Sequence, residues 1–420
     1  MSTATARTDW FTQARFGLFI HWGLYSIPAR GEWVRHYEKI PLEAYQPFFE
    51  EWNPHRYAPK KWAALARQAG LQYVVMGAKH HEGFCLFDSQ LTDYKCTNTP
   101  GRRDVAREYV EAFRAEGLRV GFYFSLIDWH HPDYPVDRLH PLRDDAAFKA
   151  KPRDFNRYLD FMHGQVRELL TNYGKIDIIW FDFSYDDMAG EKWRAAELVK
   201  LARSLQPDII MDNRLVAGHE DPSNAAAYGD FASPEQIIPP EGVVNAQGEP
   251  QVWEACITLN KHWGYARDDH EFKSPQQIVH MLVECVSKGG NLLLNVGPTA
   301  LGEFQPESID RLTAVGAWLD RNSASIYGCG NANLPKPEWG RYTQNGNTLY
   351  AHIFAKPAGP IVLLGLQDKI RKARLLMDGS EVGMSRPWNA GKTNAEFLHL
   401  PSAQLPDELD TVVALELKPS

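Results

Sequence analysis

The feature that most constrains the fold of this sequence is the alternation of short apolar runs with amphipathic stretches over its first 330 residues. Apolar runs of this length, separated by helical stretches, are typical of a parallel sheet that is covered on both faces. Strands are predicted over residues 15–21, 72–77, 119–125, 176–182, 208–212, 226–231, 251–256 and 290–295. Helices are predicted over residues 59–68, 104–116, 154–171, 191–204, 275–287 and 306–321.

Eight strands with interleaved helices predict an irregular (β/α)8 TIM-like barrel. The irregularity lies between the fifth and seventh strands, where the gaps are too short or too uneven for full crossover helices. A doubly wound sheet is the alternative, but no glycine-rich phosphate-binding fingerprint follows the first strand. In a barrel, functional side chains are expected on the loops that follow the carboxyl ends of the strands.

A second, smaller unit is predicted at the C-terminus. Residues 331–339 (NANLPKPEW) are predicted to form a linker, and Asn345-Gly346 and Asp378-Gly379 turns then separate short segments of alternating polarity. These segments cover residues 348–355, 361–366, 373–377, 396–400 and 411–417. We therefore expect a catalytic barrel over residues 1–330 and a small antiparallel β-sandwich over residues 340–420.

Charge, hydropathy and cysteine content bound the class of protein. The formal net charge is −8, which argues against a protein that binds nucleic-acid backbones. No apolar run approaches the roughly 18 residues of a membrane helix, and the first ten residues contain no apolar core of a secretion signal. The five cysteines are an odd number without paired spacing, so we expect no disulfide framework and a cytoplasmic location.

Asp182 is the strongest single candidate for chemistry. It ends the run Trp180-Phe181-Asp182 at the close of an apolar strand. A carboxylate at the carboxyl end of a barrel strand can act as a nucleophile or as a base. The alternative is an aspartate that only caps the following loop or helix.

Two adjacent histidines follow the second predicted strand. Neighbouring residues of a strand point to opposite faces, so His80 and His81 share a pocket only if the backbone leaves the ladder there. Alternatively, one histidine is packed and the other is exposed. A metal site is disfavoured, because none of the 15 histidines forms the His-x-His or His-x-x-x-His pair expected of a barrel metallohydrolase.

Further polar and aromatic side chains lie where other strands are expected to end. Each is a weak signal alone, but carboxylates interleaved with Trp, Tyr and His are typical of a glycosidase cleft, where aromatic faces pack against sugar rings. Serine chemistry lacks support, because the chain has no Gly-x-Ser-x-Gly motif. These candidates are His21, Trp22, Glu32, Trp33, Tyr123, Asp128, Trp129, His130, Asp212, Asn213, Arg214, Glu235 and Glu254.

Several stretches of the predicted barrel carry longer motifs. The longest are residues 15–23 (RFGLFIHWG), 79–84 (KHHEGF) and 286–298 (VSKGGNLLLNVGP). Shorter ones are Gly31-Glu32-Trp33, Asp128-Trp129-His130, Trp180-Phe181-Asp182 and Trp253-Glu254. In these motifs the sequence resembles the α-L-fucosidases of glycoside hydrolase family 29, over residues 10 to 328.

The resemblance implies a retaining mechanism on an irregular (β/α)8 barrel, without a metal or an organic cofactor. By position it implies that Asp182 is the nucleophile, which forms a fucosyl-enzyme. Glu235, in a Pro-Glu turn, is favoured as the acid/base residue, and Glu254 is the runner-up. The sugar-binding side chains that the resemblance implies are His21, Glu32, Trp33, His80, His81, Tyr123, Trp180 and Arg214. Glu82 and Tyr94 stand where the family usually has Asp and often Trp, which bears on substrate preference more than on activity.

We therefore expect an exo-acting retaining α-L-fucosidase that hydrolyses terminal α-L-fucose from an oligosaccharide or glycoconjugate, with transfer to another sugar where an acceptor outcompetes water. Two alternatives stay open: a glycosidase of the same fold that acts on another sugar, such as a galactoside, and a non-catalytic sugar-binding protein. The carboxylates Asp182 and Glu235 favour an enzyme. A homo-oligomer stays open beside a monomer, and neither a nucleic acid nor a membrane is expected as a partner.

Overall fold

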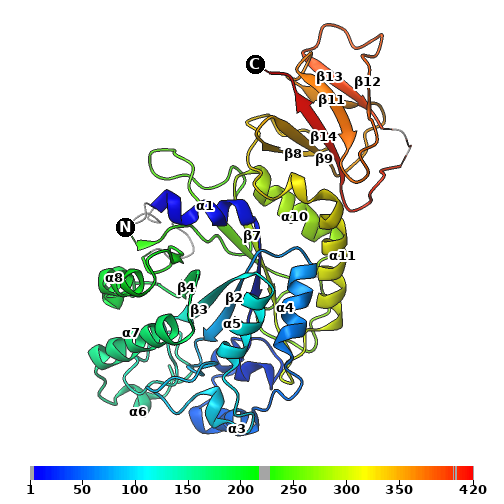
Figure 1. Ribbon diagram of the computed structural model, residues 1–420. Coiled ribbons are helices and arrows are strands. Elements are labelled where there is room, and N and C mark those ends of the chain that lie inside the picture. The colour runs from blue at the N-terminus through cyan, green and yellow to red at the C-terminus, as the bar shows by residue number, and fades with distance from the viewer. Residues whose placement is uncertain (1–3, 217–227, 401, 403, 420) are drawn as a thin grey trace.

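The larger part of the chain is a curled parallel sheet with helices on its outside (Figure 1). The structure is a computed structural model that describes residues 4–216, 228–400, 402 and 404–419. The sheet has seven strands in the order β5-β4-β3-β2-β1-β7-β6. These strands are β1 Phe16–Ile20, β2 Tyr73–Lys79, β3 Arg119–Ser125, β4 Ile178–Asp182, β5 Ile210–Met211, β6 Glu254–Thr258 and β7 Asn291–Val296.

The helices described in this part differ widely in length. The α-helices are α1 Ala4–Ala14, α2 Val34–Tyr37, α3 Leu42–Glu51, α4 Pro59–Gln68, α5 Val105–Ala115, α6 Ala146–Lys149, α7 Phe155–Asn172, α8 Ala195–Leu205, α10 Pro275–Ser287 and α11 Pro306–Asn322. The short 3-10 helices are η1 Leu24–Ser26, η2 Cys96–Asn98, η3 Gly190–Trp193 and η5 Ser323–Ser325. Among the described residues, no helix is long and apolar enough to cross a membrane.

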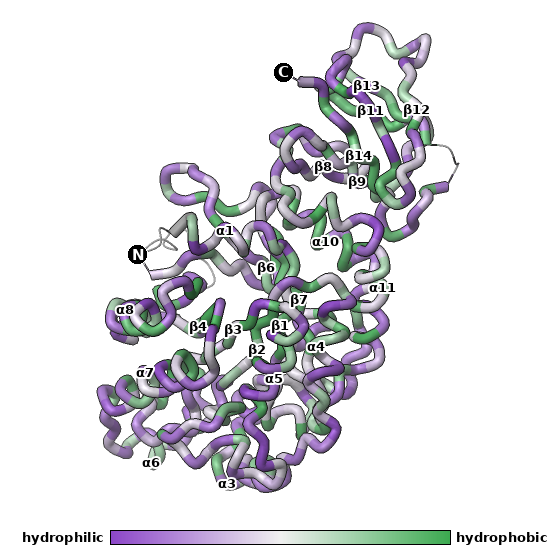
Figure 2. The backbone as a smooth tube through the Cα atoms, viewed as in Figure 1, coloured by the Kyte–Doolittle hydropathy of each residue, from purple (hydrophilic) through white to green (hydrophobic). Residues whose placement is uncertain are grey.

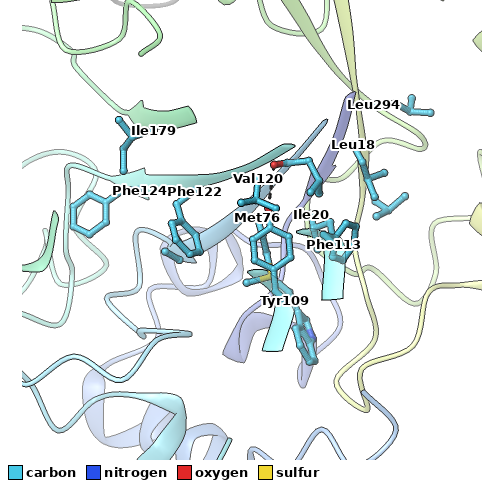
Figure 3. Packing of buried hydrophobic residues seen from close by; sticks show 14 of the residues in the cluster. Leu18, Ile20, Met76, Tyr109, Phe113, Val120, Phe122, Phe124, Ile179 and Leu294 are labelled. Atoms are coloured by element: carbon cyan, nitrogen blue, oxygen red, sulfur yellow. Dashed lines mark hydrogen bonds between the residues drawn. The ribbon is translucent and has the colours of Figure 1, made fainter. Parts of the chain in front are cut away.

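Both faces of the sheet are apolar, which is why its strands are nearly continuous apolar runs (Figure 2). On β4, Ile179 and Phe181 pack outward against the helices, whereas Ile178 and Trp180 belong to the inner cluster. Figure 3 shows the outer layer, where Tyr109 of α5 lies with the outward side chains of the central strands. The alternation along β4 places Asp182 on the same inner face as Trp180.

The gap between β5 and β6 is where the structure departs from the prediction. The strand expected over residues 226–231 is wrong for its described part, 228–231, and residues 226–227 lie outside the described ranges. Isolated parallel bridges stand in its place and join Asp212 with Phe231, Ala232 with Trp253, and Glu235 with Cys256. Gly229 packs so close to the backbone of Asp212 that a Cβ there would lie 2.5 Å from its carbonyl oxygen, and Pro234 has no N–H to donate to a ladder.

The remaining elements lie close to their predicted positions. Helices 59–68 and 275–287 and strand 119–125 coincide with α4, α10 and β3. The strand predicted over 251–256 is shifted, because β6 begins only at Glu254. The expected irregular barrel with an antiparallel β-part after it is confirmed.

The C-terminal part consists of two antiparallel sheets around a separate apolar cluster. One sheet has the order β11-β14-β9-β8 and the other β10-β13-β12. The strands are β8 Gly340–Asn345, β9 Thr348–Ile353, β10 Ile361–Leu364, β11 Ile370–Leu375, β12 Gly383–Met384, β13 Ala395–His399 and β14 Thr411–Leu417. The Asn345-Gly346 turn joins β8 to β9, and β8 and β12 were not predicted. The domain boundary between residues 330 and 340 stays a prediction.

The two parts pack on each other through α10 and α11. The ring of His280 stacks on Phe354 at 3.7 Å and bonds to the carbonyl of Leu409. Nearby, the fully buried ring of His352 bonds to Asp410 at 2.6 Å. Trp318 of α11 donates to the backbone carbonyl of Asp410, so a polar network as well as apolar contact joins the two parts.

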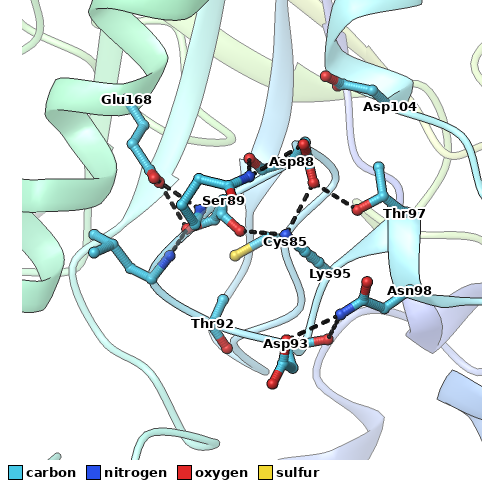
Figure 4. Close-up of polar contacts among 12 residues, drawn as sticks. Cys85, Asp88, Ser89, Thr92, Asp93, Lys95, Thr97, Asn98, Asp104 and Glu168 are labelled. Atoms are coloured by element: carbon cyan, nitrogen blue, oxygen red, sulfur yellow. Dashed lines mark hydrogen bonds and ion pairs between the residues drawn. The ribbon is translucent and has the colours of Figure 1, made fainter.

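The long connection from β2 to α5 is fixed to α7 (Figure 4). Glu168 of α7 accepts from the hydroxyl of Ser89 at 2.7 Å and from the amide of Gln90 at 2.8 Å. Lys95 donates to the carbonyl of Ser89 and pairs with Asp88 at 2.9 Å. These contacts hold the chain that leaves the carboxyl end of β2.

Candidate active site

Asp182 lies at the centre of a buried polar cluster at the carboxyl ends of the strands. It is the last residue of β4, and its side chain is 10% exposed. Tyr123 of β3 donates to its Oδ2 at 2.8 Å, and Arg214 donates to its Oδ1 at 2.8 Å. Two donors on different oxygens fix the orientation of the carboxylate.

Arg214 joins Asp182 to a second carboxylate. Its Nη1 also donates to Glu235 at 2.8 Å, while its Nε and Nη2 donate to the hydroxyl and carbonyl of Ser233 at 3.0 Å each. Its guanidinium lies 4.4 Å from the centre of the Trp180 ring. Burial by itself lowers the pKa of Arg214, but Glu235 and Asp182 outweigh burial and raise it, so the guanidinium is charged.

The two carboxylates are close together. One oxygen of Asp182 and one of Glu235 each lie 2.8 Å from the same nitrogen, so these oxygens are no more than twice that distance apart. Retaining glycosidases place their two carboxyl groups about 5–5.5 Å apart, whereas inverting ones need about 6.5–9.5 Å for a water molecule. The arrangement suits a nucleophile paired with a proton donor.

Three histidine rings border the same pocket. His80 and His81 both line it, because a bulge between Gly77 and Lys79 breaks the register with β3 and the strand then ends. Their ring centres are 4.0 Å apart, and His21, directly after β1, lies 5.7 Å from His80. Burial lowers the pKa of His21 to about 4 and that of His80 well below its usual value, so both rings are neutral near pH 7.

Most of the candidates meet in one narrow pocket. The sequence-predicted residues that line it are His21, Trp33, His80, His81, Tyr123, Trp180, Asp182, Arg214 and Glu235. Its other lining residues, which the sequence analysis missed, are Phe19, Phe183, Cys256 and Trp263.

Of the catalytic and sugar-binding residues that the family resemblance implies, Glu32 and Glu254 do not line this pocket. The strand-end candidates Trp22, Asp128, Trp129, His130, Asp212 and Asn213 do not line it either. Glu32 is buried beside it and accepts from the amide of Gly264 at 2.8 Å, and burial raises its pKa. Glu254 is the first residue of β6 and is fully buried. It accepts hydrogen bonds from Tyr73 and from Trp180, so it lies within the barrel at the N–H edge of the indole, whereas the guanidinium lies over the ring.

Two of the missed residues are aromatic. Trp263 packs against His21 at 5.1 Å, and its carbonyl accepts from Asn295. Phe183, directly after Asp182, has a φ of +85°, which is strained for a bulky side chain, and its ring lies 5.3 Å from Trp33. A Trp shortly after a strand was a usable signal for Trp263, whereas nothing in the sequence indicated the backbone of Phe183.

Within the described ranges, no group of three or more His, Cys, Asp or Glu side chains is arranged to hold a metal ion.

Comparison with known proteins gives consistent matches. A family profile described as Alpha-L-fucosidase matches residues 2–324. The tissue alpha-L-fucosidase of Homo sapiens is 28% identical over 94% of this chain and 85% of its own length. The human plasma alpha-L-fucosidase is 30% identical over 76% of this chain and 68% of its own.

Solved structures agree over the full length. Alpha-L-fucosidase isoenzyme 1 from Paenibacillus thiaminolyticus is 60% identical, with a TM-score of 0.97 and complete coverage of both chains. An alpha-L-fucosidase from Bacteroides thetaiotaomicron, solved as a trapped covalent intermediate with 2-fluoro-fucosyl fluoride, is 32% identical. Its TM-score is 0.86, with 100% of this chain and 97% of that chain covered.

Proposed function

Because this chain belongs to the α-L-fucosidase family of glycoside hydrolases, we propose that Asp182 is its nucleophile and Glu235 its general acid and base. The observation that carries this proposal is the shared nitrogen of Arg214, which binds both carboxylates at 2.8 Å. Such a separation favours a retaining enzyme that releases terminal α-L-fucose by double displacement.

The two steps follow from these roles. In the first, an oxygen of Asp182 attacks the anomeric carbon, the bond from that carbon to the glycosidic oxygen breaks, and Glu235 gives its proton to the departing oxygen. In the second, Glu235 takes a proton from water, whose oxygen attacks the same carbon and releases Asp182 as a carboxylate. The sugar therefore leaves with the configuration that it had in the substrate. An acceptor sugar in place of water gives transfucosylation.

The proposed sugar site is the pocket around these carboxylates. Neutral histidine rings both donate and accept, so His21 and His80 suit the hydroxyl groups of a sugar, and His81 beside them is proposed to bind the same groups. The aromatic rings of Trp33 and Trp180 suit its C–H face and the C5 methyl group. The other proposed sugar-binding residues are Glu32, Tyr123 and Arg214.

We propose a fucosylated oligosaccharide or glycoconjugate as the substrate, and no nucleic acid as a partner. The net charge of −8 supports the second point. A cytoplasmic location is proposed as well, supported by five cysteines that are all buried and free. Light scattering, which gives the molar mass in solution, would distinguish a monomer from a homo-oligomer.

The proposed function is tested with 4-nitrophenyl α-L-fucoside and 4-nitrophenyl β-D-galactoside. We expect the purified protein to hydrolyse the fucoside and to release α-fucose first in a proton NMR time course. Faster hydrolysis of the galactoside would favour a glycosidase for another sugar. Fucose binding without hydrolysis would favour a sugar-binding protein.

The acid/base role needs its own variant. Glu235→Gly should lower kcat/KM by about a hundredfold or more, and azide should then intercept the fucosyl-enzyme as α-fucosyl azide. Glu241→Gly, which changes an exposed glutamate of the same segment, is the matched control and should behave like the wild type. A Glu235→Gly enzyme that forms no azide product would contradict the assignment.

A further inference from the structure

Glu254 is a buried carboxyl group that the proposed mechanism does not use. It begins β6, and its side chain has no exposed surface. Tyr73 of β2 donates to its Oε2, and the indole Nε1 of Trp180 donates to its Oε1 at 3.3 Å. Among the described residues that line the pocket, Glu254 does not appear. Its two oxygens therefore face protein donors and not the sugar site.

Trp180 connects this carboxyl group to the catalytic cluster. The centre of its ring lies 4.4 Å from the guanidinium carbon of Arg214. The ring also stacks on that of Tyr123, with ring centres 5.8 Å apart and an interplanar angle of 25°. Arg214 and Tyr123 are the two side chains that donate to Asp182, each at 2.8 Å. A rotation of the indole would thus disturb both donors of Asp182 at once.

We infer that Glu254 is a positioning residue, which holds the indole of Trp180 in place and through it the two hydrogen-bond donors of Asp182. The inference rests on the proposed role of Asp182 as the nucleophile. It also replaces the acid/base role that the sequence left open for Glu254, since that role needs a carboxyl group that faces the leaving oxygen.

Glu254 is suited to a positioning role because its buried carboxyl group is uncharged near neutral pH. Burial raises its pKa to about 8, although hydrogen bonds from Tyr73 and Trp180 and the charge of Arg214 act in the opposite direction. The other titratable groups around it are the thiols of Cys256, on the same strand, and Cys285, on α10. At neutral pH the side chain is therefore a carboxylic acid, which a glutamine matches in size, in charge and in its carbonyl acceptor.

Two substitutions of Glu254 separate positioning from acid/base catalysis. Glu254→Gln should keep kcat/KM within about threefold of the wild type, because the amide oxygen still accepts from Trp180. Glu254→Leu removes the acceptor and should lower kcat/KM by about tenfold to a hundredfold, since the donors of Asp182 are then misplaced. This loss should be the same for fucosides with good and poor leaving groups, and azide should yield no α-fucosyl azide.

A double-mutant cycle tests the route through the indole. Trp180→Phe keeps a ring beside Arg214 but lacks the N–H that Glu254 accepts. If Glu254 acts through that bond, Glu254→Leu should cost no more than about twofold further in the Trp180→Phe background. If the double variant instead loses kcat/KM by the product of the two single-variant losses, the inference is contradicted.

The controls separate this result from unfolding and from a failure of the proposed function. His352→Leu, in the C-terminal part, weakens a buried polar contact far from the pocket and should leave kcat/KM unchanged while Tm falls. If Glu254→Leu does not fold, Glu254→Asp retracts the carboxyl by one methylene and should show the same loss. The inference is overturned if Glu254→Leu keeps wild-type activity, or if azide rescues it as α-fucosyl azide. An inactive wild-type protein would instead refute the proposed function.

Discussion

Replacing Lys79 by methionine would test how firmly a buried ion pair holds the histidines at the pocket. Lys79 Nζ lies 3.1 Å from Asp128 Oδ2, and neither side chain is more than 2% exposed. Lys79 directly precedes His80, and the amide of Trp129, directly after Asp128, donates to the carbonyl of His81 at 2.8 Å. The ion pair therefore ties together two chain segments that border the pocket.

The expected cost follows from what remains after the substitution. Removing one partner of a buried ion pair costs about 3–5 kcal/mol, because the other charge is left uncompensated. In Lys79→Met the Asp128 carboxylate keeps two backbone donors, the amides of His130 and His131 at 2.9 Å each. We therefore expect a loss near the lower limit, about 3 kcal/mol of unfolding free energy. The double variant Lys79→Met/Asp128→Asn should recover at least about 1 kcal/mol, since no charge stays buried.

Urea unfolding at two pH values checks this reasoning. Burial alone raises the pKa of Asp128, but Lys79, together with His130 and His131, outweighs burial and the net shift is downward. The pair thus contributes stability that is present above the ordinary aspartate pKa and is lost as the pH falls through the lowered one. The difference between wild type and Lys79→Met should narrow below about pH 4. A loss under about 1 kcal/mol at pH 7, or a difference that widens in acid, would refute the argument.

Three further outcomes are expected. In the folded protein the pKa of Glu254 is raised to about 8. The protonated side chain therefore contributes fully to the free energy of unfolding below the ordinary glutamate pKa, and this contribution is lost as the pH rises through about 8. The unfolding free energy of Glu254→Gln should therefore rise relative to that of the wild type by about 1.4 kcal/mol per pH unit between about pH 5 and pH 7. A difference between the two proteins in urea unfolding that stays constant over this pH range would contradict the prediction. His352→Leu should lower the unfolding free energy by about 2 kcal/mol, because buried Asp410 loses a partner; an unchanged denaturation midpoint would speak against that contact. Activity should survive dialysis against a chelator, whereas a loss that a divalent cation restores would contradict the expected absence of a metal.

The residues at the carboxyl ends of several barrel strands could be predicted from the sequence. Apolar runs that are buried on both faces stand out, and a polar residue that closes such a run falls at the rim. Asp182, His21 and the His80–His81 pair were found in this way, and all line one pocket. The sharing of that pocket by two adjacent histidines depends on the bulge after Gly77, which the sequence left open.

Glu254 shows why the rest could not be predicted. The strand expected over residues 251–256 placed Glu254 near a carboxyl end, whereas β6 begins with this residue. A shift of a few residues along the strand therefore moved it from the rim to the interior, beside Tyr73. The contacts of Trp263 arise from loops that meet only in the folded chain, and local periodicity does not report them.

The most direct test of the central claim is azide rescue of Asp182→Gly with 4-nitrophenyl α-L-fucoside. If Asp182 is the nucleophile, the variant loses turnover by several orders of magnitude but still binds fucose. Azide, placed where the carboxylate was, should then restore release of 4-nitrophenol and yield β-fucosyl azide. Turnover of Asp182→Gly within about tenfold of wild type, or an azide product of the α configuration, would contradict the account.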